Sequence, residues 1–278
     1  MEQHAQEVHT NALEHSGGWL IMLLLLIPLL LYLGAVMKEH RRQRPWSKLR
    51  SLSYISAIAL IAVAVSPMVT SATHHDPRGH MAQHLLLGMF APLGLVLAAP
   101  ITLLFRTLPL QAGRSLARFL RSRTGHLLSH PFMALVLNIG GMYVLYLTPL
   151  FRLSLSHPAL HILVSVHFLA FGYLYIWAIA GPDPAPRRPG MRVRTAVLGT
   201  GIAAHAFLAK LMYAHALPAG TPFSTAEVRD AAMLMYYGGD VAEFLLAVAL
   251  FASWYRGRRR SRARRRARPV LVISTIRL

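Results

Sequence analysis

The apolar residues of this chain come in blocks of about 20, the length of helix that crosses a hydrocarbon core about 30 Å thick. The chain has 278 residues, of which 55% are hydrophobic and only 14% charged, which argues against a soluble fold. We therefore predict an all-α integral membrane protein, a bundle of seven transmembrane helices. The seven blocks are 19–37, 52–70, 80–100, 132–150, 157–180, 193–217 and 231–255.

The first block is predicted to remain as a helix, because residues 1–18 contain no Lys or Arg and no small-residue cleavage site follows the block. Several blocks contain proline, which membrane helices tolerate as a kink when neighbours satisfy the freed carbonyl. These prolines are Pro28, Pro67, Pro92 and Pro149. The predicted organisation is a periplasmic segment 1–18, a transmembrane domain 19–256 and a basic cytoplasmic tail 257–278.

The Lys and Arg residues predict the orientation of the spans, because cytoplasmic loops carry an excess of these cations. They concentrate in every second loop and in the tail, with six, five, four and ten of them in 38–51, 106–130, 181–194 and 256–278. The opposite loops hold Arg78, Arg152 and Arg229. The N-terminus is therefore predicted to lie outside and the C-terminus in the cytoplasm.

The basic tail is predicted to lie against anionic lipid, where each cation near the surface contributes about 1 kcal/mol. Nucleic-acid binding is not expected despite the formal charge of +19. The cations are distributed over loops between apolar blocks, whereas a nucleic-acid-binding domain carries them on one soluble face.

The chain contains no cysteine, which excludes disulfides, thiolate metal sites and iron–sulfur clusters. Any metal must therefore be held by His, Met or carboxylate side chains. Among the 15 histidines, two pairs have the i, i+4 spacing that places both rings on one helix face: His80 with His84, and His157 with His161. Neutral imidazole is the commonest metal ligand, so we predict an outer metal site. The alternative is interfacial histidines that bond water and headgroups.

Met212 and His215, on one face of the sixth block, are predicted to lie close to this outer site. Thioether together with imidazole favours copper, above all Cu(I), although methionines in an apolar protein are mainly packing residues. The hypothesis requires imidazoles from separate spans to lie within about 8 Å of each other, since metal–nitrogen bonds are only about 2 Å long.

A second group of ionisable residues is predicted near the bilayer centre. With a rise of about 1.5 Å per residue, His167, His205 and Asp240 lie about 14–15 Å below the outer ends of their spans. Glu243 follows one turn deeper. Ionisable side chains within a span are costly and usually face a partner or a pathway. The group is a candidate deeper site or, alternatively, a structural network in which Asp240 or Glu243 pairs with Lys210.

Residues 80–100 read HMAQHLLLGMFAPLGLVLAAP, two histidines four apart that lead into an apolar helix with Pro92 and a closing Ala-Pro. With HP at 130–131, HPALH at 157–161 and the number of spans, the chain resembles the multi-span CtaG-type cytochrome c oxidase assembly proteins. Its last block, within EVRDAAMLMYYGGDVAEF, departs from the Asp-Gln pair and the Gly-Met-Trp-like run of that family.

The resemblance implies a membrane accessory factor, not an enzyme, that acts in maturation of a haem–copper oxidase in the bacterial plasma membrane. Its implied partners are cytochrome c oxidase subunits, and its implied role is to bind or deliver copper. The resemblance carries that role to His80, His84, His157 and His161. It carries no role to the acidic residues of the last block, because there this chain departs from the family pattern.

Other functions remain open on the same residues. His167 and His205 at equal depth fit the axial ligands of a haem b, and a copper or cation transporter is a further alternative. The sequence contains no phosphate-binding glycine loop, no serine nucleophile elbow and no HExxH. An enzyme is therefore not expected, and spacing alone gives thin support to an intramembrane hydrolase that uses Asp240 and Glu243.

Overall fold

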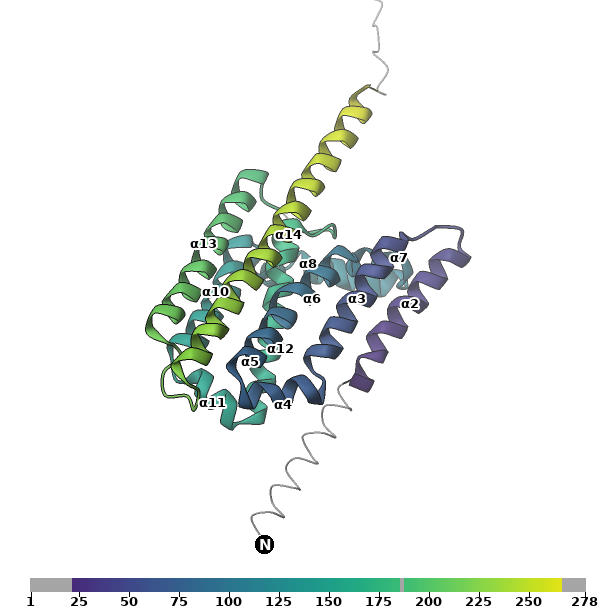
Figure 1. Cartoon of the computed structure of the whole chain (residues 1–278). Coiled ribbons are helices and arrows are strands. Elements are labelled where there is room, and N and C mark those ends of the chain that lie inside the picture. Colours follow the sequence, from purple (N-terminus) through teal and green to yellow (C-terminus); the bar gives the residue numbers. More distant parts are fainter. Residues whose placement is uncertain (1–21, 186–187, 267–278) are drawn as a thin grey trace, which may run out of the picture.

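The computed structural model describes residues 22–185 and 188–266, and every regular element in these ranges is a helix (Figure 1). The predicted segment 1–18, the start of the first block and the tail beyond residue 266 lie outside the described residues. In chain order the elements are α2 (Leu26–Arg41), α3 (Lys48–Ala64), α4 (Pro67–His75), α5 (Pro77–Leu85), the π-helix η1 (Leu86–Phe90), α6 (Ala91–Leu97), α7 (Pro100–Thr107), α8 (Leu110–Leu120), α9 (Arg123–Leu128), α10 (Pro131–Leu147), α11 (Leu150–Ser156), α12 (Pro158–Ala180), α13 (Met191–His215) and α14 (Thr225–Arg266).

Within residues 22–185 and 188–266, five helical segments are long and apolar enough to cross a membrane, and the number rises to seven if each of two bent helix pairs is one span. The bent pairs are α3 with Pro67–Thr73, at 52°, and α10 with α11, at 78°. The all-α prediction is thus confirmed for the described residues, which contain five to seven candidate membrane spans. The five single segments are Met22–Arg41, Pro77–Leu97, Pro158–Ala180, Met191–His215 and Thr225–Arg259.

Both bends occur at prolines that the sequence marked as kinks. Pro67 begins α4, and the Ser66 side chain before it accepts a hydrogen bond from the Val69 amide at 3.4 Å. Pro149 immediately precedes α11. Because proline lacks an N–H and clashes with the preceding helical turn, a new helix axis begins at each of these positions. Pro92, in contrast, lies in α6 within a continuous span, directly after the π-helix.

The third span, formed by α5, η1 and α6, is the centre of the bundle. It contacts α3 on one side and α12 and α14 on the other, while α13 packs against α14 and α10. α2 lies at the edge, against α3 and α7 (Figure 1). The buried apolar side chains accordingly form two clusters, a large one among α5, α6 and α10–α14 and a smaller one among α2, α3, η1, α6 and α7.

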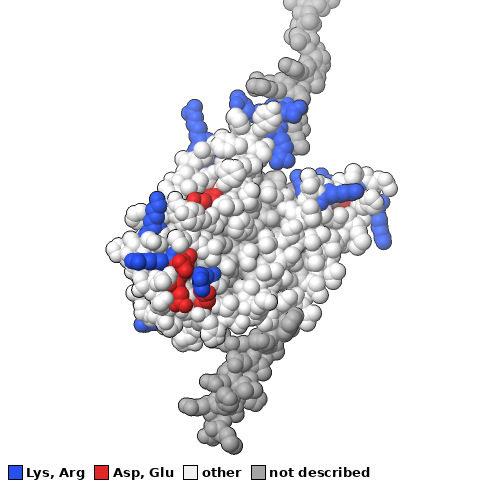
Figure 2. All heavy atoms as spheres, viewed as in Figure 1, with Lys and Arg blue, Asp and Glu red and all other residues white. Residues whose placement is uncertain are grey.

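The two ends of the bundle differ in chemistry. At the end that we call the histidine end lie α4, α11 and the turn between α13 and α14; at the opposite, arginine end lie α7, α8 and the C-terminal part of α14 (Figure 1). Lys and Arg side chains gather at the arginine end, and the broad middle of the visible surface is mostly uncharged (Figure 2). A surface of this kind fits contact with hydrocarbon between two polar layers.

Asp183, in the loop between α12 and α13, ties this loop to α7. It is 1% exposed, and its carboxylate accepts hydrogen bonds from the Ile101 amide at 3.1 Å, from the Thr102 amide at 2.7 Å and from the Thr102 hydroxyl. These donors belong to the first turn of α7, whose free N–H groups and dipole favour a carboxylate. A residue distant in sequence therefore caps α7.

Replacing Asp183 by alanine is expected to lower the free energy of unfolding by about 2 kcal/mol, because buried amide donors lose their acceptor. Asp183→Asn keeps one acceptor oxygen and is expected to lose about half as much. Thermal unfolding of the detergent-solubilised chain measures both values. An Asp183→Ala protein as stable as the wild type would contradict the capping role.

Candidate functional site

Helix α5 directs His80 and His84 into the bundle. Asp76 caps the helix by accepting a hydrogen bond from the Arg78 amide at 2.8 Å, and Pro77 occupies the first helical position, a combination typical of a helix start. The hydrogen bond from the Arg78 side chain lowers the pKa of Asp76, so this cap stays ionised. The two histidines follow one turn apart and are 4% and 5% exposed. They therefore face the protein interior and not the headgroups.

His80 of α5 meets His161 of α12 near the histidine end. The centroids of the two imidazole rings lie 6.0 Å apart, with their planes at 58°, and His161 is buried. Phe151 of α11 packs edge-on against His80 at 4.7 Å. The requirement that imidazoles from separate spans approach within about 8 Å is met here. We call His80 and His161 the outer pair.

His157, the other half of the second predicted pair, does not join this group. It is the N-cap of α12, with an extended backbone (φ −128°, ψ 102°), because Pro158 begins the helix. Its exposed ring lies 2.9 Å from the Ser156 hydroxyl and 3.1 Å from the Leu153 carbonyl oxygen. The structure thus places His161 beside His80 on another helix, and the i, i+4 arrangement with His157 is not formed.

A small cavity, which we call the central cavity, lies deeper in the bundle. Its volume is about 20 Å³, enough for one water molecule or a single ion. The π-helix η1 contributes to its wall, and such local widenings of a helix are frequent at functional sites. Its polar and sulfur-bearing lining residues come from five helices: His84, Met89, Asn138, Met142, Tyr175 and Glu243.

Gly172 allows α12 to approach η1 closely enough to enclose this cavity. A Cβ at this position would collide with the carbonyl oxygen of Gly88. That carbonyl precedes Pro92 by four residues, and proline has no N–H with which to bond it. The close helix contact at the cavity wall therefore depends on a residue without a side chain.

Glu243 also faces His205 of α13. The carboxylate Oε1 lies 3.6 Å from the ring Nδ1, which is an ion pair when the histidine is protonated. His205 is 1% exposed, and its ring packs so closely on Gly239 of α14 that a Cβ there would overlap it. The ring nitrogens of His84 and His205 and the Glu243 Oε2 accept or donate no hydrogen bond within the described residues. Buried polar atoms of this kind call for a partner, and a cation or water in the central cavity would supply one to His84 and Glu243, which line it.

The remaining predicted residues lie apart from these groups. His167 is partly buried and its Nε2 lies 3.2 Å from the Leu137 carbonyl oxygen of α10, so its ring contacts a different helix from that of His205. Met212 is buried in the large apolar cluster, His215 is exposed at the end of α13, and Asp240 is partly exposed.

The Lys210 network offered as an alternative is also not formed in the described part of the chain. The Lys210 ammonium lies 5.3 Å from the Tyr236 ring centroid, in a cation–π arrangement on an exposed face. Glu243 faces His205 instead, which is a cation only when it is protonated. Among the described residues, the buried Glu243 carboxylate therefore has no permanently charged partner.

Three kinds of residue that lie beside these histidines or line the central cavity were not predicted from the sequence. Tyr146 lies edge-on to both His80 and His84, at 6.3 Å and 6.1 Å between centroids, and its hydroxyl donates to the Met81 sulfur at 3.8 Å. Met89 and Met142 line the central cavity, but nothing distinguishes them from the other methionines in the sequence. Asn138 carried a readable signal, because a lone amide stands there in an otherwise apolar block.

Within residues 22–185 and 188–266, no three His, Asp or Glu side chains lie close enough together to hold one metal ion. A closed site built from these residue types alone is therefore not formed there. The arrangement instead offers two imidazoles in the outer pair, and one imidazole with thioether, amide and carboxyl groups around the central cavity. Such sets suit ions that accept few or soft ligands.

The chain is similar to several mycobacterial proteins. Uncharacterised proteins of Mycobacterium bovis and Mycobacterium tuberculosis are each 31% identical to the chain over 247 residues, which is 81% of this chain and 37% of theirs. One of Mycobacterium leprae is 32% identical over 183 residues, 63% of this chain and 28% of its own. The chain thus spans about a third of the length of the curated relatives it matches, and no solved structure matches it.

Residues 30–257 match the family described as cytochrome c oxidase caa3 assembly factor (Caa3_CtaG). The match begins in α2, includes the outer pair and the central cavity, and ends in α14. It therefore covers every membrane-crossing helix of the described structure at least in part. The chain belongs to the Caa3_CtaG family of cytochrome c oxidase assembly factors.

Proposed function

We propose that this protein holds Cu(I) as cargo at the outer pair and in the central cavity, and passes it to a cytochrome c oxidase while that enzyme is assembled. The family supplies the connection to oxidase assembly, and the side chains supply the argument for copper. The observation that carries the proposal is the approach of His80 and His161, on separate helices, to 6.0 Å between ring centroids.

The number and type of ligands favour Cu(I) over zinc. Structural zinc sites are almost always four-coordinate and tetrahedral, and the described residues form no group of three His, Asp or Glu that would begin such a site. Two bonds of about 2 Å to nitrogen fit between the rings of the outer pair after small side-chain adjustments. Thioether sulfur, present twice around the central cavity, selects Cu(I) among the common metals.

The positions of the groups suggest a path from the histidine end inward. His84 follows His80 by one helical turn, a rise of about 6 Å, and lines the central cavity beyond the outer pair. The Glu243 carboxylate on the far wall of the cavity would offset the charge of a monovalent cation in a medium that disfavours ions. A few weak ligands at each station would let the ion leave again.

We also infer seven spans, with the N-terminus outside and the C-terminus in the cytoplasm of a bacterial plasma membrane. This count treats each bent helix pair as one span. The loops with many Lys and Arg lie at the arginine end, which the positive-inside rule assigns to the cytoplasm. The histidine end then faces the outer aqueous side, and the outer pair lies where copper would enter.

The protein acts, on this proposal, as an accessory factor and not as an enzyme. Its partners are the oxidase subunits that receive the metal, and anionic lipid lies against its basic tail. Membership in an assembly-factor family supports a non-catalytic role. The haem b alternative requires His167 and His205 to share one ligand, and these rings contact different helices.

Copper binding by the purified protein tests the proposal. Detergent-solubilised full chain is loaded with Cu(I) under reducing conditions and titrated with a Cu(I) chelator. The His80→Ala/His161→Ala variant is expected to bind Cu(I) at least about tenfold more weakly than wild type, because the two ligands of the outer pair are gone. The matched control is His157→Ala, which removes an exposed imidazole from the same helix end and is expected to leave the affinity unchanged.

Equal Cu(I) affinity in the wild type and the double variant would overturn the proposal. The absorbance spectrum of the same samples tests the haem alternative, since a sharp reduced α-band that disappears in His205→Ala would favour it. Copper flux into liposomes containing only this protein would instead favour a transporter.

A further inference from the structure

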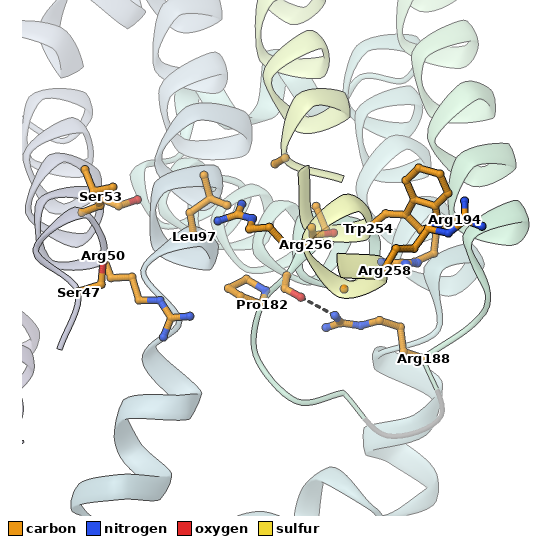
Figure 3. Close-up of a pocket in the computed structure, with 16 residues that line it drawn as sticks. Ser47, Arg50, Ser53, Leu97, Pro182, Arg188, Arg194, Trp254, Arg256 and Arg258 are labelled. Carbon is orange, nitrogen blue, oxygen red and sulfur yellow. Dashed lines mark hydrogen bonds between the residues drawn. The ribbon is translucent and has the colours of Figure 1, made fainter. Parts of the chain in front are cut away.

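A large pocket opens at the arginine end, away from the outer pair and the central cavity. Its volume is about 1060 Å³, and it lies between the start of α3, the end of α6, the α12–α13 loop and α14 (Figure 3). Among the described residues, no Asp or Glu lines it. We call it the arginine pocket, because five arginines line it: Arg50, Arg188, Arg194, Arg256 and Arg258.

Two of these arginines are held in place by the backbone. Arg188 donates hydrogen bonds to the carbonyl oxygens of Gly181 and Asp183, the latter at 2.8 Å, and Arg194 donates to the carbonyl oxygen of Ile179 at 3.0 Å. The Nε of each guanidinium is buried and makes no hydrogen bond to the described residues. The two groups are therefore fixed in orientation while each retains a donor.

The pocket has an excess of positive charge. Burial, and then the neighbouring positive charge of Arg194, lower the pKa of the Arg188 guanidinium, whereas the charge of Asp183 raises it. The nearby Asp183 carboxylate is occupied by the amides of α7. In Figure 3, Arg50 lies on one side of the pocket and Arg256 and Arg258 on the other, so cations surround the space. An anion bound between them would meet guanidinium groups from α3, α13 and α14.

Apart from the arginines and Ser47, Ser53 and Ser253, the lining side chains are apolar. Leu97 of α6, Ala249 and Trp254 of α14, and Leu49 of α3 are among them, and Leu49 is 77% exposed on the outside of the bundle. The volume is that of a site for a sizeable organic molecule, well beyond the needs of a small inorganic ion. The pocket thus combines cationic groups with apolar walls that continue toward the membrane-facing surface.

We propose that the arginine pocket binds the phosphate headgroup of an anionic phospholipid, with the start of its acyl chains along Leu97 and Ala249. Arginine forms charge-assisted, often bidentate hydrogen bonds with phosphate. Basic pockets between transmembrane helices on the cytoplasmic side are typical sites for such headgroups. The bound lipid would join α3, from the smaller apolar cluster, to α13 and α14, from the large one.

Lipid titration of the delipidated, detergent-purified full chain tests this assignment. Phosphatidylglycerol, phosphatidylcholine with the same acyl chains and inorganic phosphate are added separately, and binding is followed by native mass spectrometry and by the unfolding midpoint. Phosphatidylglycerol is expected to bind saturably and to raise the midpoint, whereas the other two ligands are not expected to do so at equal concentration. Arg188→Gln/Arg194→Gln is expected to weaken its binding at least about tenfold.

The matched control is Arg123→Gln/Arg192→Gln, which removes two exposed cations that do not line the pocket. It is expected to bind phosphatidylglycerol like the wild type. Ala249→Trp, which places an indole inside the pocket without changing its charge, is expected to weaken binding and covers the case in which the double Arg variant does not fold. Wild-type binding by Ala249→Trp, or equal losses in the pocket and control variants, would refute the site. Equal protection by inorganic phosphate would refute the lipid as its ligand.

Discussion

Cells that carry His80→Ala/His161→Ala in place of the wild-type chain are expected to lose at least about nine-tenths of their cytochrome c oxidase activity. The outer pair is the first station of the proposed path, and its imidazoles come from separate helices whose rings lie 6.0 Å apart. Without them, copper reaches the central cavity only at a rate set by its concentration in the medium. Added copper is therefore expected to restore most of the activity by mass action.

A cavity variant separates copper capture from copper passage. His84→Leu leaves the outer pair intact but removes the imidazole that lines the central cavity, so its oxidase defect is expected to persist at high copper. The control His157→Ala is expected to show no defect at any copper concentration. Oxidase turnover and the copper content of the purified oxidase measure these outcomes. Wild-type oxidase in the double variant at low copper, or full copper rescue of His84→Leu, would contradict the proposed path.

Replacing Gly172 by valine is expected to destabilise the protein by about 3 kcal/mol or more, at the upper end of the usual cost of overpacking. The new Cβ would meet the carbonyl oxygen and carbon of Gly88 and the ring of Pro92. Backbone atoms of a central helix cannot rotate away as a side-chain tip can. α12 would have to move off η1, which would open the central cavity and separate His161 from His80.

Gly199 of α13 provides the matched control, because nothing lies within 4 Å of a Cβ built there. Gly199→Val is expected to be neutral or slightly stabilising, since glycine is a poorer helix former than valine by a few tenths of a kcal/mol. Unfolding midpoints in one detergent compare the two variants. Similar midpoints for Gly172→Val and Gly199→Val would show that the α12–η1 contact is not tight in solution.

The sequence placed the membrane-crossing regions well because span length depends only on the thickness of the hydrocarbon core. Each of the seven predicted blocks overlaps a helical segment or a bent helix pair of the structure. The angles at Pro67 and Pro149 were not predictable, because a proline marks where a helix is interrupted, whereas the packing of neighbouring helices sets the new direction. The number of candidate spans in the described part of the chain, from five to seven, depends on those two bends.

The candidate site was predicted in part. His80 and His84 share a buried face because a four-residue spacing is a property of the single helix. The same spacing did not place His157 and His161 on one helix face. Pro158 starts the helix after His157, and the His157 ring therefore lies outside it. The depths estimated from the helical rise correctly predicted that Glu243 and His205 lie in one region, and the two side chains are in contact in the structure. The depths could not separate them from His167, since depth gives no information on the direction in which a side chain points.

By itself, the sequence determined the class of protein, the run of helices, the excess of arginine at one end and the two histidine pairs near the other. These properties follow from local hydrophobicity and from charge, which every residue carries wherever the helices pack. Only the tertiary structure decided that His161 stands beside His80, that Met89 and Met142 share a cavity with Glu243, and that five arginines line one pocket. Contacts between helices depend on their rotation and neighbours, which here rest on close approaches such as that of Gly172 to Gly88.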